Sequence, residues 1–392
     1  MKEKAIQHQS LKEYGFVMKS IYEVCETVTD YVAAGSFADL KKNVEYLSEP
    51  NYAQLIRTVD LKSRFLKGNF IYVSKKAFDY LWRVNLNCES IILPNIGNCG
   101  EVYYVVPEKL PYKNNVLATN AILVRSLKES NKYLFYIFQS KHFQDELKRI
   151  TSPVGQTKFN KTELKNICIP IPSRKVQEEI VKILDSFTNL IDALNEELSL
   201  RQKQLEYYRE KLLTFEECEC EWKKLGDILD YEQPSKYIVS SSEYDDNYDI
   251  PVLTAGQSFI LGYTDEKEGV YKASKNNPTI IFDDFTTGHH WVDFDFKIKS
   301  SAMKMLRLKN NKSLLRYIFY SMALINYVPT EHSRQWISKY SQFEIPLPDI
   351  KDQECIVNSL DNFTNLISSL KEEIALRQKQ YEYYREKLLT FD

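Results

Sequence analysis

Adjacent pairs of histidines and of aspartates are the first candidates for chemistry in this chain, and both pairs have the wrong spacing for it. His289 and His290 are consecutive, and consecutive residues of a strand face opposite sides, so they are poor joint metal ligands. We expect one to pack and the other to reach out. Asp283 and Asp284 are also consecutive, which favours a role in a turn over general acid–base catalysis.

Other chemical motifs are absent or isolated. Cys218 and Cys220 form a CxC pair in an acidic run, without a second cysteine pair or a nearby histidine, so no zinc site is expected. The PDIK sequence at residues 348–351 looks like a nuclease motif but opens a predicted helix, where Asp349 would act as a cap. No P-loop, HExxH, GxSxG or strand-linked GxGxxG is present. We therefore predict a protein that is not an enzyme and has no metal or cofactor of its own.

Composition and charge exclude some classes of protein. The chain has 392 residues, with 43% hydrophobic and 27% charged residues, which is typical of a soluble globular protein. No apolar run approaches the ~18 residues that cross a bilayer, and the N-terminus does not resemble a signal peptide. Seven scattered cysteines indicate free thiols in a reducing cytosol. A cytoplasmic protein without a membrane partner is expected.

The net charge of −2 argues against a tight nucleic-acid binder acting alone, because phosphate neutralisation dominates non-specific affinity. Local basic patches remain compatible with it. Residues 297–316 contain seven lysines and arginines without an acidic residue, and Arg57 to Lys67 form a smaller basic group around Asp60. Each group is either a solvated face or a track for phosphates.

A long internal repeat organises the whole chain. Residues 169–215 and 345–391 align without a gap at an offset of 176, and both end in EYYREKLLTF. Within each copy, apolar residues alternate at steps of four and three, which is the pattern of a coiled-coil helix. Arg201 and Arg377 occupy equivalent core positions. Each either packs its stem while its head reaches water or fixes the register of the pair.

We predict that the two helices pair antiparallel, because a compact domain can then join the end of the first helix to the start of the second. The charges suggest a register that brings Glu197 near Lys387 and Lys211 near Glu373. The predicted helix-pair interface comprises Phe187, Ile191, Leu194, Leu198, Arg201, Tyr208, Phe363, Ile367, Leu370, Ile374, Arg377 and Tyr384.

Each helix follows a domain with the same predicted order of loop, strand, strand, helix, loop and strand. The loop at residues 283–290 corresponds to that at 94–100, and residues 333–339 correspond to 155–161. We predict domains at residues 1–168 and 221–344, with helical spacers at 169–220 and 345–392. The expected class is α+β, with two pseudo-symmetric mixed α/β domains separated by an antiparallel coiled coil of two long helices.

Two variable domains, each followed by an IP-P…Q segment and LRQKQ-EYYREKLL, resemble the specificity (S) subunit of type I restriction-modification systems. The resemblance rests on residues 169–172 with Gln177 and on residues 345–348 with Gln353. The resemblance covers nearly the whole chain. It implies two target recognition domains that read the halves of a bipartite, asymmetric site in double-stranded DNA, at a spacing that a rigid helix pair would fix.

The resemblance also implies partners and their cofactors. Two methyltransferase (M) subunits would dock on the helices and carry S-adenosylmethionine with the N/D-P-P-Y/F motif, which this chain lacks. Two restriction (R) subunits, using ATP and Mg, would complete the nuclease. Alternatives are an orphan specificity subunit that serves methylation only, a non-DNA coiled-coil scaffold, and a self-contained nuclease.

Turn-rich segments with amides, hydroxyls and basic groups are the expected readers of bases. We expect half or more of the candidates to lie on one DNA-facing surface. The predicted DNA-binding residues are Ser36, Asn43, Arg57, Asn95, Asn98 and Gln156 in the first domain, and Gln257, Thr286, Thr287, His289, His290, Ser301, Lys304, Arg334 and Gln335 in the second.

Overall fold

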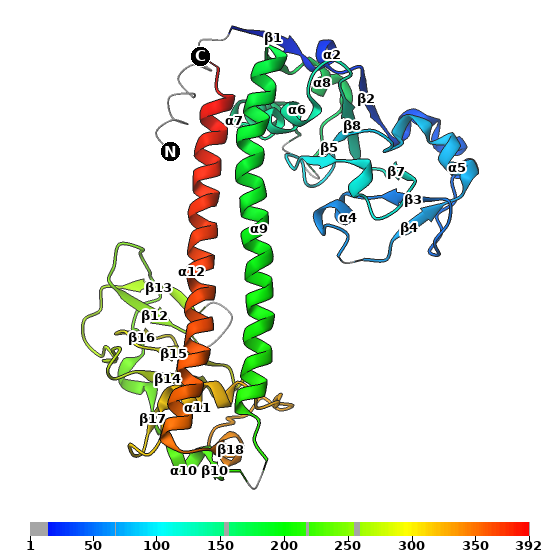
Figure 1. The fold of residues 1–392 in the computed structure, drawn as a ribbon. Helices are drawn as coiled ribbons and strands as arrows, with labels where there is room; N and C mark the ends of the chain where they lie inside the picture. The colour runs from blue at the N-terminus through cyan, green and yellow to red at the C-terminus, as the bar shows by residue number, and fades with distance from the viewer. Residues whose placement is uncertain (1–14, 67, 153–156, 217–218, 255–258, 392) are drawn as a thin grey trace. The chain divides into compact units, whose positions relative to one another are not determined.

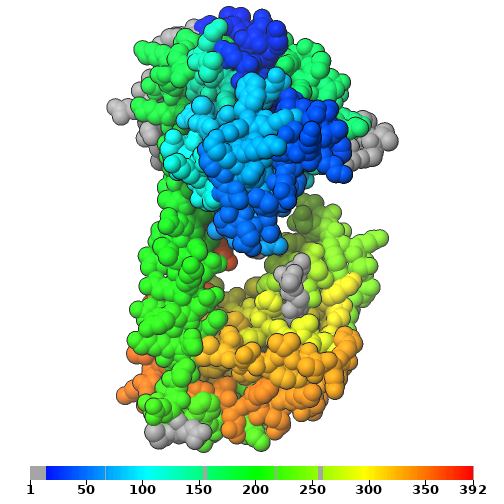
Figure 2. All heavy atoms as spheres, turned by 90° about the vertical axis from the view of Figure 1, so that its right-hand side faces the viewer, coloured from blue at the N-terminus to red at the C-terminus, as the bar shows by residue number. Residues whose placement is uncertain are grey.

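The computed structural model describes residues 15–66, 68–152, 157–216, 219–254 and 259–391. The chain divides into two compact units, Met1–Ala193 with Ile374–Asp392, and Leu194–Glu373. Each unit contains one mixed α/β domain and one half of each of two 40-residue helices, α9 (Arg174–Leu213) and α12 (Ile350–Leu389). In Figure 2, blue-to-cyan segments form the front of the first unit, and yellow-to-orange segments form the front of the second.

In the part of the first domain that the structure describes, the strands form three sheets. One is four-stranded, in the order β2-β8-β5-β6, one is three-stranded, in the order β4-β3-β7, and β1 pairs with β9. The strands are β1 (Phe16–Ser20), β2 (Thr27–Asp30), β3 (Ala53–Ile56), β4 (Ile71–Val73), β5 (Ser90–Pro94), β6 (Tyr103–Val105), β7 (Asn115–Leu117), β8 (Ala121–Arg125) and β9 (Cys168–Pro172). The helices are α2 (Ile21–Val24), α3 (Phe37–Asn43), α4 (Thr58–Lys62), α5 (Lys75–Tyr80), α6 (Asn131–Phe138), α7 (Lys141–Ile150) and α8 (Lys161–Asn166).

The second domain repeats this topology strand for strand. Its sheets have the orders β11-β17-β14-β15, β13-β12-β16 and β10-β18. The strands are β10 (Glu221–Lys224), β11 (Leu229–Glu232), β12 (Ile250–Leu253), β13 (Ile260–Thr264), β14 (Thr279–Asp283), β15 (His289–Val292), β16 (Lys297–Ile298), β17 (Met303–Leu308) and β18 (Glu344–Leu347). The helices are α10 (Leu225–Ile228) and α11 (Leu315–Met322). The predicted pseudo-symmetry is confirmed.

Each four-stranded sheet is buried on both faces. In β5, Ile91 and Leu93 pack into a core that includes α6 and α9, whereas Ile92 packs into the core shared with the three-stranded sheet. In β14, Phe282 and Ile281 divide in the same way between the two cores of the second domain. This alternation follows from the period of two along a strand.

The helices α9 and α12 pair antiparallel, as predicted. In the first unit, Phe187 of α9 stacks on Tyr384 of α12 with ring centroids 5.3 Å apart, and in the second unit Tyr208 stacks on Phe363, also at 5.3 Å. Moving 21 residues forward along α9 therefore moves 21 residues back along α12. Figure 1 shows the two helices side by side. The two stacks are equivalent under the repeat, because each pairs a phenylalanine of one copy with a tyrosine of the other.

All twelve residues of the predicted helix-pair interface are buried or half-buried in the structure. The charge-based register was wrong, however. Tyr208 faces Phe363, so Lys211 lies opposite Leu360 and not opposite Glu373. The rings and leucines of the seam determine the register, whereas exposed ion pairs contribute little.

The two core arginines behave alike. Arg201 donates to Glu197 and Gln204 of its own helix, and Arg377 donates to Gln380 at 2.9 Å. Each guanidinium thus bonds polar neighbours on its own helix. This arrangement fits a packed stem whose head reaches towards water.

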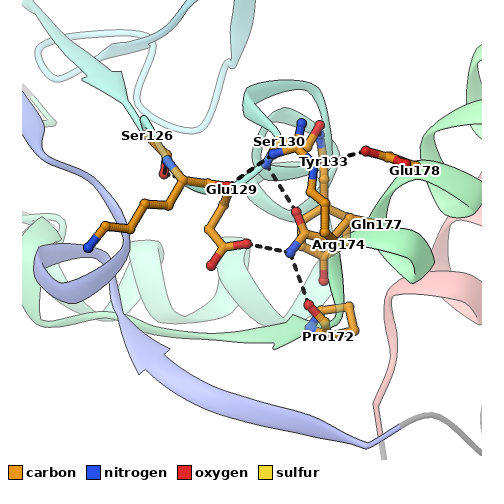
Figure 3. Close-up of polar contacts among 9 residues, drawn as sticks. Ser126, Glu129, Ser130, Tyr133, Pro172, Arg174, Gln177 and Glu178 are labelled. Carbon is orange, nitrogen blue, oxygen red and sulfur yellow. Dashed lines mark hydrogen bonds and ion pairs between the residues drawn. The ribbon is translucent and has the colours of Figure 1, made fainter.

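A buried glutamine joins each domain to its long helix, and Figure 3 shows the one in the first domain, Gln177. Gln177 has no exposed surface; its side chain donates to Pro172 O at 3.0 Å and to Glu129 Oε2 at 2.6 Å, and it accepts from Ser130 N at 3.0 Å. Ser130 is the residue that caps α6. One side chain therefore links the end of β9, the start of α9 and the start of α6.

The second domain has the same glutamine contacts. Gln353 is 1% exposed; it donates to Pro348 O at 2.9 Å and accepts from Leu314 N, at the start of α11, at 2.9 Å. The predicted capping role of the PDIK sequence is also confirmed, because Asp349 Oδ1 accepts from Lys351 N and Asp352 N at 2.9 and 3.0 Å.

Two tyrosines complete each connection. In the first unit Tyr133 donates to Pro170 O at 2.9 Å, and Tyr136 donates to Asp185 Oδ1 of α9 at 2.5 Å. The corresponding bonds in the second unit, with the same two lengths, run from Tyr317 to Pro346 O and from Tyr320 to Asp361 Oδ1 of α12. The residues shared by the two repeats thus form one domain–helix junction, built twice.

We predict that Gln177→Ala lowers the free energy of unfolding by about 2–4 kcal/mol, because it leaves the buried Ser130 N–H and Pro172 carbonyl without partners. Gln202→Ala, an exposed substitution on the same helix, should change it by less than about 0.5 kcal/mol. Urea unfolding of both variants measures the difference. Equal stability of the two variants would refute the structural role of Gln177.

Candidate DNA interface

Three loops converge at one end of the four-stranded sheet of the second domain. We name this the three-loop junction; here it comprises residues 284–288, 300–302 and 333–336. Asp284 is its centre: its N–H donates to Ala302 O at 2.8 Å and its carbonyl accepts from Gln335 N at 2.8 Å. Its carboxylate also accepts from Trp336 N at 2.8 Å. A single residue therefore ties all three loops together.

A buried ion pair lies beneath this junction. Lys304 Nζ lies 3.1 Å from Asp284 Oδ2, outside hydrogen-bond geometry, and both side chains are 1% exposed. The same ammonium lies 4.8 Å from the ring centroid of Tyr231, a cation–π distance. A buried charge pair is costly to desolvate. The other oxygen of the same carboxylate accepts from Trp336 N in the third loop.

The first domain builds the equivalent junction from residues 95–100, 119–120 and 157–160. Asn95 takes the place of Asp284, because its N–H donates to Asn120 O and its carbonyl accepts from Phe159 N, both at 3.1 Å. Gly97 N also donates to Thr157 O at 2.9 Å. The predicted correspondence between the loops of the two domains is thus confirmed. Ile122, which pairs with Leu93 as Lys304 pairs with Phe282, takes the place of the lysine.

The backbone is left-handed at both junctions. Asn120 has φ 68° and Thr287 has φ 61°. Asparagine adopts this conformation readily, but a β-branched threonine does so at a cost. Asp283 supports the second turn by accepting from Phe285 N at 2.8 Å and from Thr286 N at 2.9 Å. The predicted turn-forming role of Asp283 is confirmed.

Eight of the predicted DNA-binding residues belong to the three-loop junctions or to the buried pair beneath. Asn98, Thr286, Ser301 and Arg334 are exposed there, whereas Asn95, Thr287, Lys304 and Gln335 are buried or half-buried. Lys304 and Gln335 are 1% and 0% exposed, so their side chains lie inside the domain in this structure. Gln335 instead accepts from the Tyr327 hydroxyl and donates within its own loop, to Ser333 O and Oγ. Both residues hold the junction from inside.

Three candidates of the first domain lie elsewhere. Ser36 caps α3 through Asp39 N, and Asn43 donates to Asp39 O at 2.9 Å. Arg57 forms a bidentate pair with Asp60, at 3.0 and 2.7 Å, and also donates to Asn69 O. Its guanidinium therefore holds the loop together, which leaves few donors for a base. Gln156 and Gln257 lie outside the described residues.

His289 and His290 follow the junction on β15 and face opposite sides, as predicted. The ring of His289 meets Phe319 of α11 edge-on at 5.5 Å, and that of His290 stacks on Phe259 at 4.7 Å. Both rings therefore pack against aromatic neighbours, and neither is the outward-reaching histidine that we expected. Burial lowers the pKa of His289 to about 4. Among the described residues, no group of three His, Cys, Asp or Glu side chains could hold a metal ion.

Several cations of the two basic stretches pair with acidic side chains of the protein. Lys297 pairs with Glu266 at 2.8 Å, and Arg316 pairs with Asp361 at 2.7 Å. In the first domain, Lys62 pairs with Glu101 at 2.6 Å. These paired cations are not available to a phosphate track, which was one of the two alternatives for each stretch. Charges that alternate along a strand are separated onto two faces, which a linear count of charge does not reveal.

Sequence reasoning missed several residues of the junctions. Asp284 was assigned to a turn, and Asn120, Thr157 and Trp336 were not singled out. The signal that could have revealed Asn120 is an asparagine directly before a buried strand, where a left-handed residue ends a turn. Nothing in the sequence pairs Asp284 with Lys304, which lies 20 residues further along the chain.

The family profile described as "Type I restriction modification DNA specificity domain" matches this chain twice, over residues 15–201 and 219–376. Together these matches cover most of the chain. The chain belongs to this family. Its two family domains each contain one three-loop junction and one glutamine-centred connection to a long helix.

Relatives of this specificity protein agree with the assignment. It is 53% identical to the type I restriction enzyme EcoR124I/EcoR124II specificity subunit of Escherichia coli over 197 residues, a match that spans 47% of each chain, about half the length of that relative. A putative type I restriction enzyme specificity subunit of Haemophilus influenzae is 29% identical over 300 residues, covering 70% of this chain and 76% of that one.

The fold is also found in a solved structure. The type I restriction-modification system S subunit from M. genitalium superposes with a TM-score of 0.62 at 13% identity, covering 96% of both chains. Among the helices that the structure describes, none is long and apolar enough to cross a membrane.

We predict that His289 makes the stability of this specificity protein fall at acidic pH. Its folded-state pKa of about 4 lies below the unfolded value near 6.5. The stabilisation is therefore complete above pH 6.5 and is lost as the pH falls towards 4, by roughly 2–3 kcal/mol. Urea unfolding at pH 7 and pH 4.5 should show a smaller loss for His289→Gln than for the wild type. The exposed His332→Gln serves as control, and equal losses in all three proteins would contradict the assignment.

Proposed function

We propose that this chain is the DNA-recognition subunit of a type I restriction-modification complex and is not itself an enzyme. Each domain reads one half of a bipartite, asymmetric site in double-stranded DNA. The observation that supports this most strongly is one scaffold built twice with different loops. Strand order and domain–helix junction are the same in both domains, whereas the residues displayed at the three-loop junctions differ. A constant scaffold with variable loops is the usual architecture of recognition.

The proposal includes the partners that the resemblance implies. Two methyltransferase subunits supply S-adenosylmethionine-dependent methylation, and two restriction subunits supply ATP- and Mg-dependent cleavage. In this proposal the low net charge is offset because the partner subunits also contact the duplex. The complex acts in the cytoplasm, where its DNA substrate lies.

Exposed apolar side chains on the long helices suit docking of the methyltransferase. Leu190, Leu200 and Tyr207 of α9 each directly precede a seam residue, so they lie on one flank of the helix. Their repeat equivalents on α12 are Leu366, Leu376 and Tyr383, and all six are between 38% and 63% exposed.

Each unit presents one complete set of these side chains. The second unit has Leu200, Tyr207 and Leu366, and the first has the repeat equivalents. Exposed apolar groups at repeated positions mark an interaction surface. Two equivalent sets suit two copies of one partner, as expected for two methyltransferase subunits.

The central test is to sequence the methylome of cells that co-express this chain with its cognate methyltransferase. We expect one methylated motif made of two specific segments separated by a fixed non-specific spacer. A second experiment replaces residues 221–344 with the second domain of another family member. This exchange should change one specific segment of the methylated motif and leave the other segment unchanged. An orphan subunit would give methylation without cleavage. A non-DNA scaffold would give no motif, and a self-contained nuclease would cut DNA with the purified chain and metal alone.

We predict that Leu200→Ser with Tyr207→Ser removes one of the two methyltransferase copies, because only the set in the second unit is altered. Native mass spectrometry of the purified complex should show the stoichiometry fall from two copies to one. Gln202→Ser, an exposed substitution off this flank of the same helix, is the matched control. Retention of two copies in the double variant would exclude this docking surface.

A further inference from the structure

We propose that the three-loop junction is the base-reading surface of each domain, and that Asp284 and Lys304 are positioning residues for the half-site read by the second domain. This inference rests on the proposed function and adds the surface that contacts DNA. It also separates residues that touch bases from residues that hold them in place.

The junction loops lie at the same end of the four-stranded sheet in both domains. At this end, Asn95 and Asp284 each receive one backbone bond from a late loop and give one to the loop that precedes β8 or β17. Segments separated by up to 64 residues are thereby fixed side by side. Loops held by a rigid sheet can present side chains to a groove with the precision that hydrogen bonding to base edges requires.

The exposed side chains at both junctions have the chemistry of base and phosphate recognition. They are mainly amides, hydroxyls and cations, which are the groups that contact base edges and phosphates. Glu331, beside the third loop of the second domain, is an exposed acidic neighbour. The exposed polar residues are Asn98, Thr119, Asn120, Thr157, Lys158 and Asn160 in the first domain, and Thr286, Ser300, Ser301 and Arg334 in the second.

The buried residues beneath the two junctions differ as a pair, with two charged residues in one domain and two neutral residues in the other. The second domain places the charged pair Asp284 and Lys304 where the first places the neutral residues Asn95 and Ile122. The carboxylate of Asp284 bonds Trp336 N at 2.8 Å. Asn95 instead donates its amide to Phe159 O at 3.3 Å, and its buried Oδ1 has no hydrogen-bond partner among the described residues. The third loop is therefore held differently in each domain.

A buried ion pair can often be replaced by neutral groups without loss of stability, whereas removal of one partner leaves an uncompensated charge. The geometry of this pair indicates that it positions the third loop, which carries Arg334. Lys304 holds the carboxylate, the carboxylate holds Trp336 N, and Arg334 lies two residues before Trp336.

The test is a charge-balanced double variant, Asp284→Asn with Lys304→Ile, which gives the second domain the residues of the first. It is co-expressed with the cognate methyltransferase, and methylation is measured at the wild-type motif and at every single-mismatch site. We expect discrimination to relax by about tenfold or more in one half-site only. Thr157→Ala with Lys158→Ala, at the junction of the first domain, should relax the other half-site.

The matched control is Glu266→Gln with Lys297→Met. It removes another ion pair of the same domain, whose lysine is also buried and whose partners lie 2.8 Å apart, but this pair lies outside the junction. We expect unchanged discrimination in both halves. If the double variant at the junction is too unstable to assemble, the exposed substitution Arg334→Ala decides in its place, with the same expected relaxation of one half-site.

The outcomes separate this inference from the proposed function. The inference is overturned if the wild type gives a bipartite motif and the folded junction variant either keeps its discrimination or relaxes it equally in both half-sites. The proposed function then still stands. Absence of any bipartite motif in the wild type overturns both.

Discussion

The bonding needs of a proline-containing turn constrain the rest of this structure. Each long helix begins just after a pair of prolines, which cannot donate backbone hydrogen bonds: before α9 both lie in β9, whereas before α12 Pro346 lies in β18 and Pro348 follows it. The carbonyls of Pro172 and Pro348 are satisfied by buried glutamine side chains one turn into the helix. The same glutamines accept from the N–H groups of Ser130 and Leu314, the cap residues that precede α6 and α11, so strand, long helix and domain helix are fixed together.

This constraint explains why the helices are nearly identical while the domains differ. The first half of α9 and the last half of α12 share one unit, and the remaining halves share the other. Leu388 and Leu389 of α12 accordingly lie in the core of the first unit, as Leu212 and Leu213 of α9 pack in that of the second. Equivalent positions of α9 and α12 therefore pack against the same kind of neighbour, each in its own unit. The loops at the far end of each sheet carry no such requirement.

The features that sequence could predict are those that depend on periodicity. The repeat, the heptad seam, the antiparallel pairing and the correspondence of the loops are all readable from spacing. Residues 115–125 form two strands, β7 and β8, with left-handed Asn120 between them, and two helices follow, α6 and α7, with Ser140 as the cap of α7. These breaks depend on single residues, a left-handed asparagine and a serine whose side chain accepts from Phe143 N, and a periodic pattern does not reveal them.

The residues of the interface were harder to predict, because charge in a sequence does not reveal burial. Lys304 looked like a surface cation within a basic stretch, yet it lies inside the domain beside Asp284. A lysine at a position that its strand turns inward requires a partner there. The first domain shows the alternative solution, with asparagine and isoleucine at these two positions. A change of one residue alone would leave a buried charge unpaired, so such domains must diverge by exchanging the members of the pair together. The interior beneath the loops, and not only their exposed tips, is therefore part of what makes the two domains different.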